Sequence, residues 1–409
     1  MSLNIVPLKD LCNNYKTDIV DGPFGANLKR EHYKEEGIPV LKIQNIKSFN
    51  ITLKKMDYVD QAKFDELRRH SYINGDIVMT KLGNPLGESA IVEGLDEGLI
   101  VADLVRIRTQ KIDTQYLCYH LNSPVTSAYI NSQQKGTTRP RVRIAVVRDL
   151  PIYTPSLAEQ QRIVAILDQA FADIEKARAN AEQNLKNARE LFDSYLQQVF
   201  SQRGEGWEKK QLGDAVVVER GSSPRPIKQF RTESGDGVNW IKIGDAKEGQ
   251  KYITSTKEKI TKEGAEKSRF VDVGDFILSN SMSFGRPYIM SIQGYIHDGW
   301  FVLRLPDEID SEYFYYLLSS PYLATQFQGL AAGAIVKNIS GDLVKKAMLP
   351  IPPLKTQKDI VEKSIKFSGE ITSLQVIYQH KLKSLDELKK SLLQKAFIGE
   401  LTKNKGMAA

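Results

Sequence analysis

The sequence predicts an α+β protein in which two mixed α/β globules are separated by two long antiparallel helices that form an intramolecular coiled coil. Three observations support this fold class. The second half of the chain repeats the first, each half changes once from short strand-like segments to a stretch almost free of glycine and proline, and both stretches carry heptad patterns. The predicted architecture is therefore an internal repeat with pseudo-twofold symmetry.

Length and composition already exclude several classes of protein. At roughly 100 to 200 residues per domain, the 409 residues suffice for two or three domains, and 41% hydrophobic with 26% charged residues exclude a disordered chain. No run approaches the roughly 18 apolar residues of a membrane span, so we expect a cytoplasmic protein with no membrane partner. Only Cys12 and Cys118 are present, without a CxxC pair, which excludes a disulfide framework and a zinc knuckle. A net charge of +7 permits a nucleic-acid partner without requiring one.

Four pairs of segments show the repeat. GIPVLKIQNI from Gly37 is echoed by GVNWIKIGDA from Gly237, and NGDIVMTK from Asn74 by VGDFILSN from Val273. DTQYLCYHLNSP from Asp113 matches DSEYFYYLLSSP from Asp310, and LPIYTPSLAEQQRIV from Leu150 matches LPIPPLKTQKDIV from Leu349 if two residues are deleted. A period near 200 is too long for a solenoid, so we expect two copies of one two-part unit.

Each copy begins with strand-like segments and ends in one long helix. Ser156 and Glu159 form a capping box that starts the first helix, and Gly204 marks its end. The second helix, from Leu354 to Phe397, contains one glycine, Gly369, and lacks the Ser and Glu of the capping box because PPLKTQK replaces PSLAEQQ. We expect globules at residues 1–155 and 204–352, and helices at 156–203 and, with a tail, 353–409.

The two heptad seams complement each other when the helices run antiparallel, with paired residue numbers that add up to 555. Small residues of the first helix then face large ones of the second, as Ala177 faces Tyr378, although Ile174 meets Lys381. The first helix carries 5 basic and 7 acidic residues and the second 9 and 5, so their charges attract. The alternatives are helices that pack only on their own globules, or a homodimer. The pairing candidates are Ile163, Leu167, Ala170, Ala177, Ala181, Ala188, Phe367, Leu374, Tyr378, Leu385, Leu388 and Leu392.

Motifs for catalysis are missing from the sequence. It contains no phosphate-binding loop, dinucleotide fingerprint, HExxH helix or GxSxG elbow, and its five histidines are scattered. NPLG at Asn84 lacks the second proline and the aromatic residue of an amino-methyltransferase pocket and is interpreted as a turn. We predict a chain that is not an enzyme; an active site assembled from distant residues is the alternative.

Candidate DNA contacts fall in three matched regions. The basic segment KGTTRPRVRI suits phosphates and guanine edges, because Arg donates two hydrogen bonds in one plane; a solvated strand edge is the alternative. The loops after the Gly-Asp strands and the glycine-containing segments DGPFGANLKREHY and GSSPRPIKQF are the other two regions, and ordinary polar turns would explain them equally. The candidates are Lys29, Arg30, Lys81, Asn84, Lys135, Thr137, Thr138, Arg139, Arg141 and Arg143 in the first half, and Arg225, Asn280, Ser281, Ser283, Arg286, Lys337 and Asn338 in the second.

These segments, in this order and in two copies, resemble the specificity subunit of type I restriction-modification systems over the whole chain. The resemblance implies that each globule is a target recognition domain that reads half of a bipartite, asymmetric DNA site. It also implies that the paired helices set the spacing and dock two DNA-adenine methyltransferase subunits, to which ATP-dependent restriction subunits add. S-adenosylmethionine, ATP and Mg²⁺ would be bound by those partners and no cofactor by this chain. A dimeric coiled-coil adaptor that binds proteins without reading DNA is the alternative.

Overall fold

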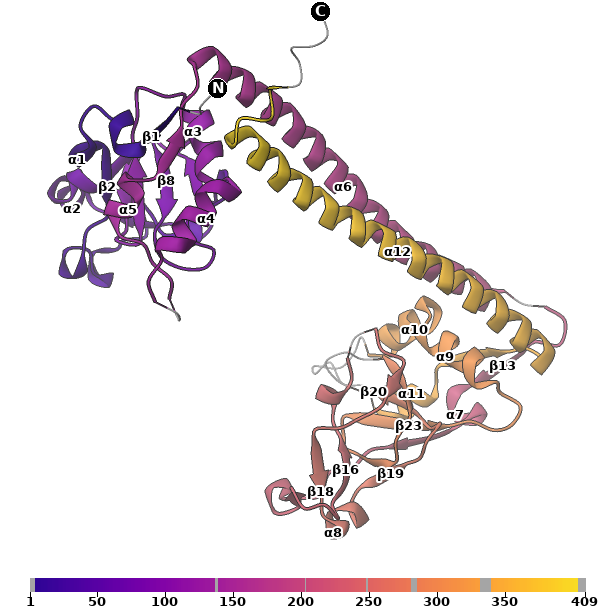
Figure 1. The fold of residues 1–409 in the computed structure, drawn as a ribbon. Helices are drawn as coiled ribbons and strands as arrows, with labels where there is room; N and C mark the ends of the chain where they lie inside the picture. The colour runs from indigo at the N-terminus through magenta and orange to yellow at the C-terminus, as the bar shows by residue number, and fades with distance from the viewer. Residues whose placement is uncertain are drawn as a thin grey trace, which may run out of the picture. The chain divides into compact units, whose positions relative to one another are not determined.

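The computed structural model describes residues 4–136, 139–202, 204–247, 249–280, 285–331 and 340–403. The chain divides into two compact units: unit 1 comprises Met1–Ala181 with His380–Ala409, and unit 2 comprises Glu182–Gln379. Two long helices, α6 (Leu157–Ser201) and α12 (Leu354–Phe397), each contribute to both units (Figure 1). The predicted combination of two mixed α/β globules and two long helices is confirmed.

The globule of unit 1 contains two four-stranded sheets. One has the order β6 (Asp57–Val59), β3 (Ile38–Leu41), β10 (Glu97–Ile100) and β7 (Ser71–Ile73), with β3 and β10 parallel. The other is antiparallel, with the order β2 (Ile19–Asp21), β11 (Leu104–Ile107), β8 (Ile77–Thr80) and β9 (Ser89–Ile91). Two short pairs are β1 (Ile5–Pro7) with β12 (Pro151–Tyr153), and β4 (Ile46–Lys47) with β5 (Asn50–Ile51). The helices are α1 (Tyr15–Asp18), α2 (Gln61–Glu66), α3 (Thr114–Leu121), α4 (Pro124–Gln133) and α5 (Ile144–Arg148).

The globule of unit 2 contains two five-stranded sheets. One has the order β14 (Val217–Arg220), β23 (Trp300–Arg304), β20 (Phe276–Ser279), β21 (Pro287–Met290) and β17 (Tyr252–Ile253). The other has the order β15 (Arg231–Thr232), β18 (Glu258–Ile260), β16 (Val238–Ile241), β22 (Gly294–Ile296) and β19 (Arg269–Val271). β13 (Glu208–Gln211) pairs with β24 (Met348–Ile351). The helices are α7 (Leu212–Ala215), α8 (Lys262–Glu266), α9 (Ser311–Ser319), α10 (Pro321–Ala331) and α11 (Gly341–Lys345).

The two globules share one core topology, to which unit 2 adds the edge strands β15 and β17, and this confirms the internal repeat. In each, a short strand from the echo segment that begins at Gly37 or Gly237 lies parallel to a later strand, β3 with β10 and β16 with β22. The Gly-Asp strands β8 and β20 pair in the same way with β11 and β23. The aspartates that precede them accept backbone N–H groups and pair with arginines: Asp76 with Arg108, and Asp275 with Arg304. These two aspartates therefore have a structural role.

The predicted two-residue deletion in the last echo is wrong. The hydroxyl of Tyr116 donates to the carbonyl of Tyr153 at 2.9 Å, and that of Tyr313 donates to the carbonyl of Pro350 at 2.6 Å. Both pairs are related by an offset of 197, without a gap. The LPI tripeptides that were matched by letters therefore occupy different positions on β12 and β24, because the backbone register is set by hydrogen bonds to the globule rather than by residue identity.

A buried glutamine joins each globule to its long helix, and the sequence analysis missed both. Gln160 is 3% exposed and Gln357 is fully buried. Gln160 accepts the backbone N–H of Asp113 and donates to the carbonyl of Pro155, and Gln357 bonds Asp310 and Pro352 in the same way. Gln160 and Gln357 are 197 positions apart, which is the offset of the repeat. This spacing was a signal in the sequence that could have revealed them.

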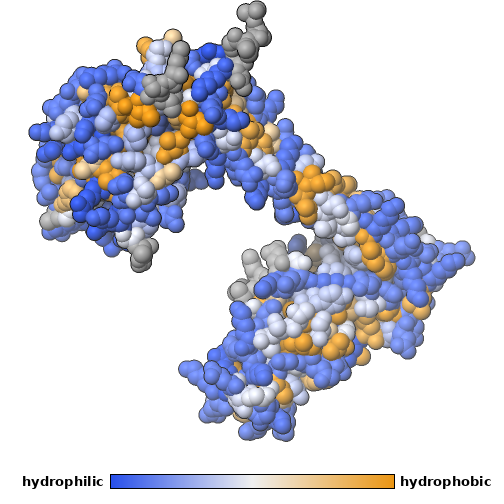
Figure 2. All heavy atoms as spheres, in the orientation of Figure 1, coloured by the Kyte–Doolittle hydropathy of each residue, from blue (hydrophilic) through white to orange (hydrophobic). Residues whose placement is uncertain are grey.

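Both helix starts lie where they were predicted, with different caps. Ser156 accepts the backbone N–H of Glu159 at 3.3 Å, which is the serine half of the predicted capping box, and α6 follows at Leu157. The second helix starts at Leu354 without that cap, directly after two prolines. The ends of both helices enter the hydrophobic cores of the globules: Ile163 and Leu167 with Phe397 in unit 1, and Leu196 and Phe200 in unit 2. Figure 2 shows the hydrophobic residues that remain at the surface along these helices.

The antiparallel, intramolecular pairing of the helices is confirmed within each unit, but the predicted register is wrong. Glu175 would have faced position 380, yet its carboxylate lies 3.2 Å from the ammonium of Lys389, nine residues further along. In unit 2, Phe367 was expected opposite Ala188 but contacts Tyr195, with ring centroids 5.0 Å apart. A shift of about one heptad keeps the same seam while changing every partner, which is why the volume argument could not select it.

One of the two rows of residues in the predicted seam of α12 is also displaced, by one position along the helix. Leu374 and Leu388 are 38% and 47% exposed, whereas Leu382 is half-buried and Leu393 is 3% exposed. A heptad seam alternates steps of three and four residues, so the second row of the seam can be placed at either of two adjacent positions. Leucines occur at both positions in α12, and only the partner helix decides which of them is buried. The remaining pairing candidates are buried or half-buried: Ile163, Leu167, Ala170, Ala177, Ala181, Ala188, Phe367, Tyr378, Leu385 and Leu392.

Candidate nucleic-acid interface

In unit 1, the three predicted binding regions meet around one cavity of about 730 Å³. Phe24 comes from the loop after β2, Lys81 from the turn after β8, and Lys135 with Arg141 from the basic segment between α4 and α5. Arg143 lines the cavity as well. The topology therefore brings together residues that are up to about 120 positions apart in the sequence and that belong to all three candidate regions.

The basic segment is held as a paired strand rather than as a loose loop. Lys135 and Arg141 exchange both backbone hydrogen bonds, at 2.9 and 3.0 Å, and the N–H of Val142 donates to the carbonyl of Lys81 at 3.0 Å. Arg139 lies exposed within this turn. Thr137 and Thr138 lie outside the described residues. Backbone pairing on both sides limits how far Arg141 can move and so favours contacts of fixed geometry.

The cations of the cavity lining and of the basic segment are of two kinds. Lys135, Arg139, Arg141 and Arg143 are exposed, and none of them makes an ion pair with another described residue. The ammonium of Lys81 instead lies 2.6 Å from the carboxylate of Asp21, with only 12% and 16% of the two side chains exposed. Guanidinium groups without an acidic partner are available to phosphates, whereas the charge of Lys81 is already compensated.

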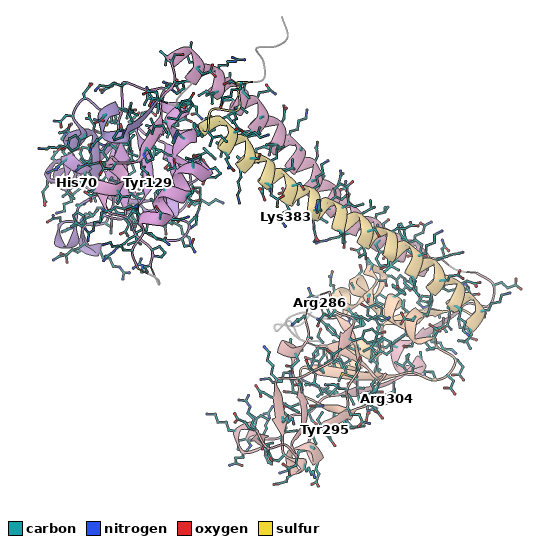
Figure 3. All side chains as sticks on the ribbon, in the orientation of Figure 1. His70, Tyr129, Arg286, Tyr295, Arg304 and Lys383 are labelled. Atoms are coloured by element: carbon teal, nitrogen blue, oxygen red, sulfur yellow. The ribbon has the colours of Figure 1, made fainter. Side chains whose placement is uncertain are left out.

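The loop that carries Phe24 is constrained by close backbone packing. A Cβ on Gly22 would lie 2.2 Å from the backbone carbonyl carbon of Val101, so only glycine fits there. Phe24 is 61% exposed, and the ammonium of Lys81 lies 4.8 Å from the centroid of its ring. His70, labelled in Figure 3, contacts the carbonyl of Asp21 through Nδ1 at 2.6 Å. An exposed aromatic ring is thereby presented at the rim of a basic cavity.

The other candidates of the first half lie apart from this cavity. Lys29, Arg30 and Asn84 are exposed but do not line it. The ammonium of Lys29 lies 3.7 Å from the carboxylate of Glu31. Their assignment to DNA contacts stays a prediction.

In unit 2, the candidates gather around Asp298, which the sequence analysis missed. The hydroxyl of Ser223 donates to its carboxylate at 2.6 Å, and this bond lowers the pKa of Asp298. The guanidinium of Arg225, 83% exposed, lies 3.8 Å from the same carboxylate, and the amide of Asn280 donates to the Asp298 carbonyl at 2.7 Å. Arg286 lies just before β21 (Figure 3). Ser281, Ser283, Lys337 and Asn338 lie outside the described residues.

The two clusters occupy equivalent places but present different chemistry. The N–H of Lys81 donates to the carbonyl of Asp103, and the N–H of Asn280 donates to the carbonyl of Gly299, both at 2.9 Å. A lysine and an aspartate in one globule are thus replaced by an asparagine and a glycine in the other. Two surfaces with different donors and acceptors match different base edges.

Clustered metal ligands or reactive thiols would mark a catalytic site. Throughout the ranges that the structure describes, no three or more His, Cys, Asp or Glu side chains come together as a metal ion requires. Burial raises the pKa of the Cys12 and Cys118 thiols to about 12, which makes them poor nucleophiles. No helix among the described residues is both long and apolar enough to cross a bilayer.

Comparison with known proteins identifies the family. The model of the type I restriction modification DNA specificity domain matches residues 4–183 and 204–379, one match in each half. The putative type I restriction enzyme MjaX specificity subunit of Methanocaldococcus jannaschii is 25% identical over 94% of this chain and 92% of its own length. The StySPI specificity subunit of Salmonella potsdam is 23% identical over 92% of this chain and 86% of its own.

Solved structures share the fold. A chain from a study of complex assembly and conformational transition of the type I R-M system aligns with a TM-score of 0.73 at 19% identity, over 98% of this chain and all of that one. The HsdS subunit from Thermoanaerobacter tengcongensis aligns with a TM-score of 0.58 at 21% identity, over 97% of both chains. The chain therefore belongs to the type I restriction-modification DNA specificity family and is a specificity subunit, the non-catalytic component that determines DNA sequence specificity.

Proposed function

We propose that the two clusters read the two halves of one asymmetric, bipartite DNA site. The observation that carries this proposal is the difference between equivalent surfaces: unpaired guanidinium groups and an exposed aromatic ring in unit 1, and a Ser, Arg and Asn arrangement around Asp298 in unit 2. Exposed arginines that lack acidic partners suit phosphate and guanine contacts, because they donate paired hydrogen bonds in one plane. Each globule would contact bases independently, so exchanging one globule should change one half-site only.

The paired helices are the proposed docking surface for two DNA-adenine methyltransferase subunits, to which ATP-dependent restriction subunits add. α12 exposes Leu374, Val376 and Ile377, by 38%, 60% and 59% respectively, although hydrophobic side chains of this size gain by burial. Protein partners would cover them. In this arrangement the partners bind S-adenosylmethionine, ATP and Mg²⁺, this chain binds no cofactor, and the complex acts on cytoplasmic DNA.

The proposal is tested by measuring site-specific methylation by the assembled complex with Arg139→Ala and Arg141→Ala. Each lost phosphate contact should reduce the slope of log affinity against log salt by about one, and a lost guanine contact should relax one position of the site. Arg68→Ala is the matched control, because Arg68 is an exposed arginine just after α2 that does not line the cavity. Unchanged sequence preference and salt dependence in both arginine variants would remove these residues from the interface.

The dimeric adaptor without DNA readout is not favoured, since the chain belongs to a DNA specificity family. DNA footprinting of the complex separates the two functions. Two protected patches with an unprotected gap support the bipartite reader, whereas no protection in the presence of the methyltransferase subunits supports the adaptor.

A further inference from the structure

One carboxylate lines the basic cavity of unit 1 without a partner. Asp103 lies in the turn between β10 and β11, where the N–H of Leu104 donates to the carbonyl of Val101 at 3.0 Å and the N–H of Lys81 donates to the carbonyl of Asp103 at 2.9 Å. These bonds hold its backbone on both sides. Among the described residues, however, no group donates a hydrogen bond to its carboxylate or pairs with it.

The surroundings make this unpartnered acid unusual. Asp21, the other acid of the cavity, is neutralised by Lys81 at 2.6 Å, while Arg141 and Arg143 line the same space with no acidic partner. A carboxylate that faces DNA is repelled by the phosphates, which weakens binding. Its position is favourable only where a hydrogen-bond donor of a base replaces the missing partner.

Base edges in the major groove offer few such donors. Guanine presents O6 and N7 and thymine O4, which are all acceptors, so a carboxylate rejects both. Adenine presents the N6 amino group beside the acceptor N7, whereas cytosine presents the N4 amino group alone. An aspartate is therefore matched best by cytosine.

We propose that Asp103 is a specificity-determining residue that accepts a hydrogen bond from the N4 amino group of a cytosine in the half-site read by unit 1. This inference rests on the proposed DNA-reading function and deepens it by naming one recognised base. The neighbouring Arg141 and Arg143 supply the phosphate contacts that hold the duplex against the cavity, and Asp103 selects the base within that register.

The equivalent position of unit 2 cannot carry the same contact. Gly299 takes the place of Asp103, and a Cβ built on it would lie 2.1 Å from the ring of His297. That ring is itself fixed, with Nε2 accepting the N–H of Ile243 at 3.1 Å. The cytosine requirement therefore applies to one half-site and contributes to the asymmetry of the whole site.

The experiment compares Asp103→Asn and Asp103→Ala with the unaltered chain, each assembled with its methyltransferase subunits, on a duplex library with randomised bases. Sequencing of the methylated fraction gives the preference at every position. We expect a cytosine preference of between about 5-fold and 150-fold at one position in the unaltered complex. It should be lost in Asp103→Ala and should move towards adenine in Asp103→Asn, since an amide can bond N6 and N7 together.

Asp65→Ala is the control for loss of one negative charge, because Asp65 is an exposed acid of α2 outside the cavity lining. It should leave every base preference unchanged. Asp103→Asn conserves shape, so a melting temperature equal to that of the unaltered chain shows that the fold is kept. If Asp103→Ala binds DNA more tightly but keeps the same preference at all positions, the carboxylate acts only through its charge and the inference is overturned. If the unaltered complex methylates without any preferred sequence, the proposed function itself fails.

Discussion

Acidification should destabilise unit 1 through a single buried histidine, His120. Its ring is 1% exposed and lies between two groups that specify one neutral tautomer. The hydroxyl of Thr126 donates to the carbonyl of His120 at 2.7 Å and so accepts Nδ1–H at 3.0 Å, while Nε2 accepts the N–H of Tyr153 at 3.0 Å. A second proton on the ring would place an Nε2–H group against the backbone N–H of Tyr153 in a buried site. Burial accordingly lowers the pKa of His120 to about 3.

The sign and the magnitude follow from proton linkage. Above pH 6.5 neither the folded nor the unfolded state protonates this ring, so its full contribution to stability is present. As the pH falls from 6.5 towards 3, only the unfolded state gains the proton and stability is lost. At pH 5 the loss relative to pH 8 is about 2 kcal/mol, from 1.36 kcal/mol per pKa unit over the 1.5 units below 6.5.

The other half of the molecule supplies the control variant. At the equivalent positions, offset by 197, unit 2 has Leu317 and Pro350, an apolar side chain and a residue without an N–H. His120→Leu alone leaves the Tyr153 N–H without an acceptor and should cost about 1–3 kcal/mol. Adding Tyr153→Pro removes that donor and should restore much of the stability while abolishing the pH dependence.

The unfolding of the two units can be followed separately, because the cysteines and the tryptophans lie in different units. Both cysteines, Cys12 and Cys118, are buried in unit 1, whereas all three tryptophans lie in unit 2. Urea titrations at pH 8 and pH 5 can therefore follow unit 1 by thiol labelling with a pyridyl disulfide, which reacts in acid, and unit 2 by tryptophan fluorescence. The reasoning is refuted if the labelling midpoint falls by the same amount between the two pH values in the unaltered chain and in the double variant.

Three further substitutions test other contacts, each by urea denaturation with the same two probes. Gln160→Ala should destabilise unit 1 by about 2–4 kcal/mol, since the half-buried backbone groups of Asp113 and Pro155 lose their partner. An effect below about 0.5 kcal/mol, on the order of a surface change, would contradict its role in joining the globule to α6. Arg178→Ala should cost only about 0.2–1 kcal/mol, because its ion pair with Asp386 is partly open to solvent, with 25% and 57% of the two side chains exposed, and restoring charge balance with Asp386→Ala should cost nothing more. Gly22→Ala should destabilise by about 1–3 kcal/mol, because its Cβ would overlap the carbonyl of Val101, whereas Gly25→Ala has no neighbour to meet and should be limited to backbone strain.

The sequence was sufficient for the large-scale organisation. Spacing of echo segments predicted two copies of one unit, and the absence of glycine and proline predicted both long helices to within a few residues at each end. Such features depend on local propensity and on hydrophobic periodicity, which neighbouring residues determine by themselves. The sequence also named Lys81, Lys135 and Arg141 as candidates, and the fold places all three around one cavity.

Contacts between distant residues were not accessible in the same way. Asp103 and Asp298 belong to no motif. Gln160 and Gln357 repeat within the last echo segment, but their roles follow only from the backbone groups that they meet. The ion pair with Asp21 likewise distinguishes Lys81 from the unpaired arginines of the basic segment, although the sequence alone shows all of them only as cations.

Repetition, the two long helices and their antiparallel pairing were thus determined by the order of residues alone. The helix register, the row of the seam that faces the partner and the base-facing acid were decided only by the tertiary structure. A heptad pattern is satisfied equally after a shift of seven residues, and a polar side chain acquires its role from the groups that folding places around it. Glu175 beside Lys389 and Asp103 without a partner are the two contacts that show this most directly.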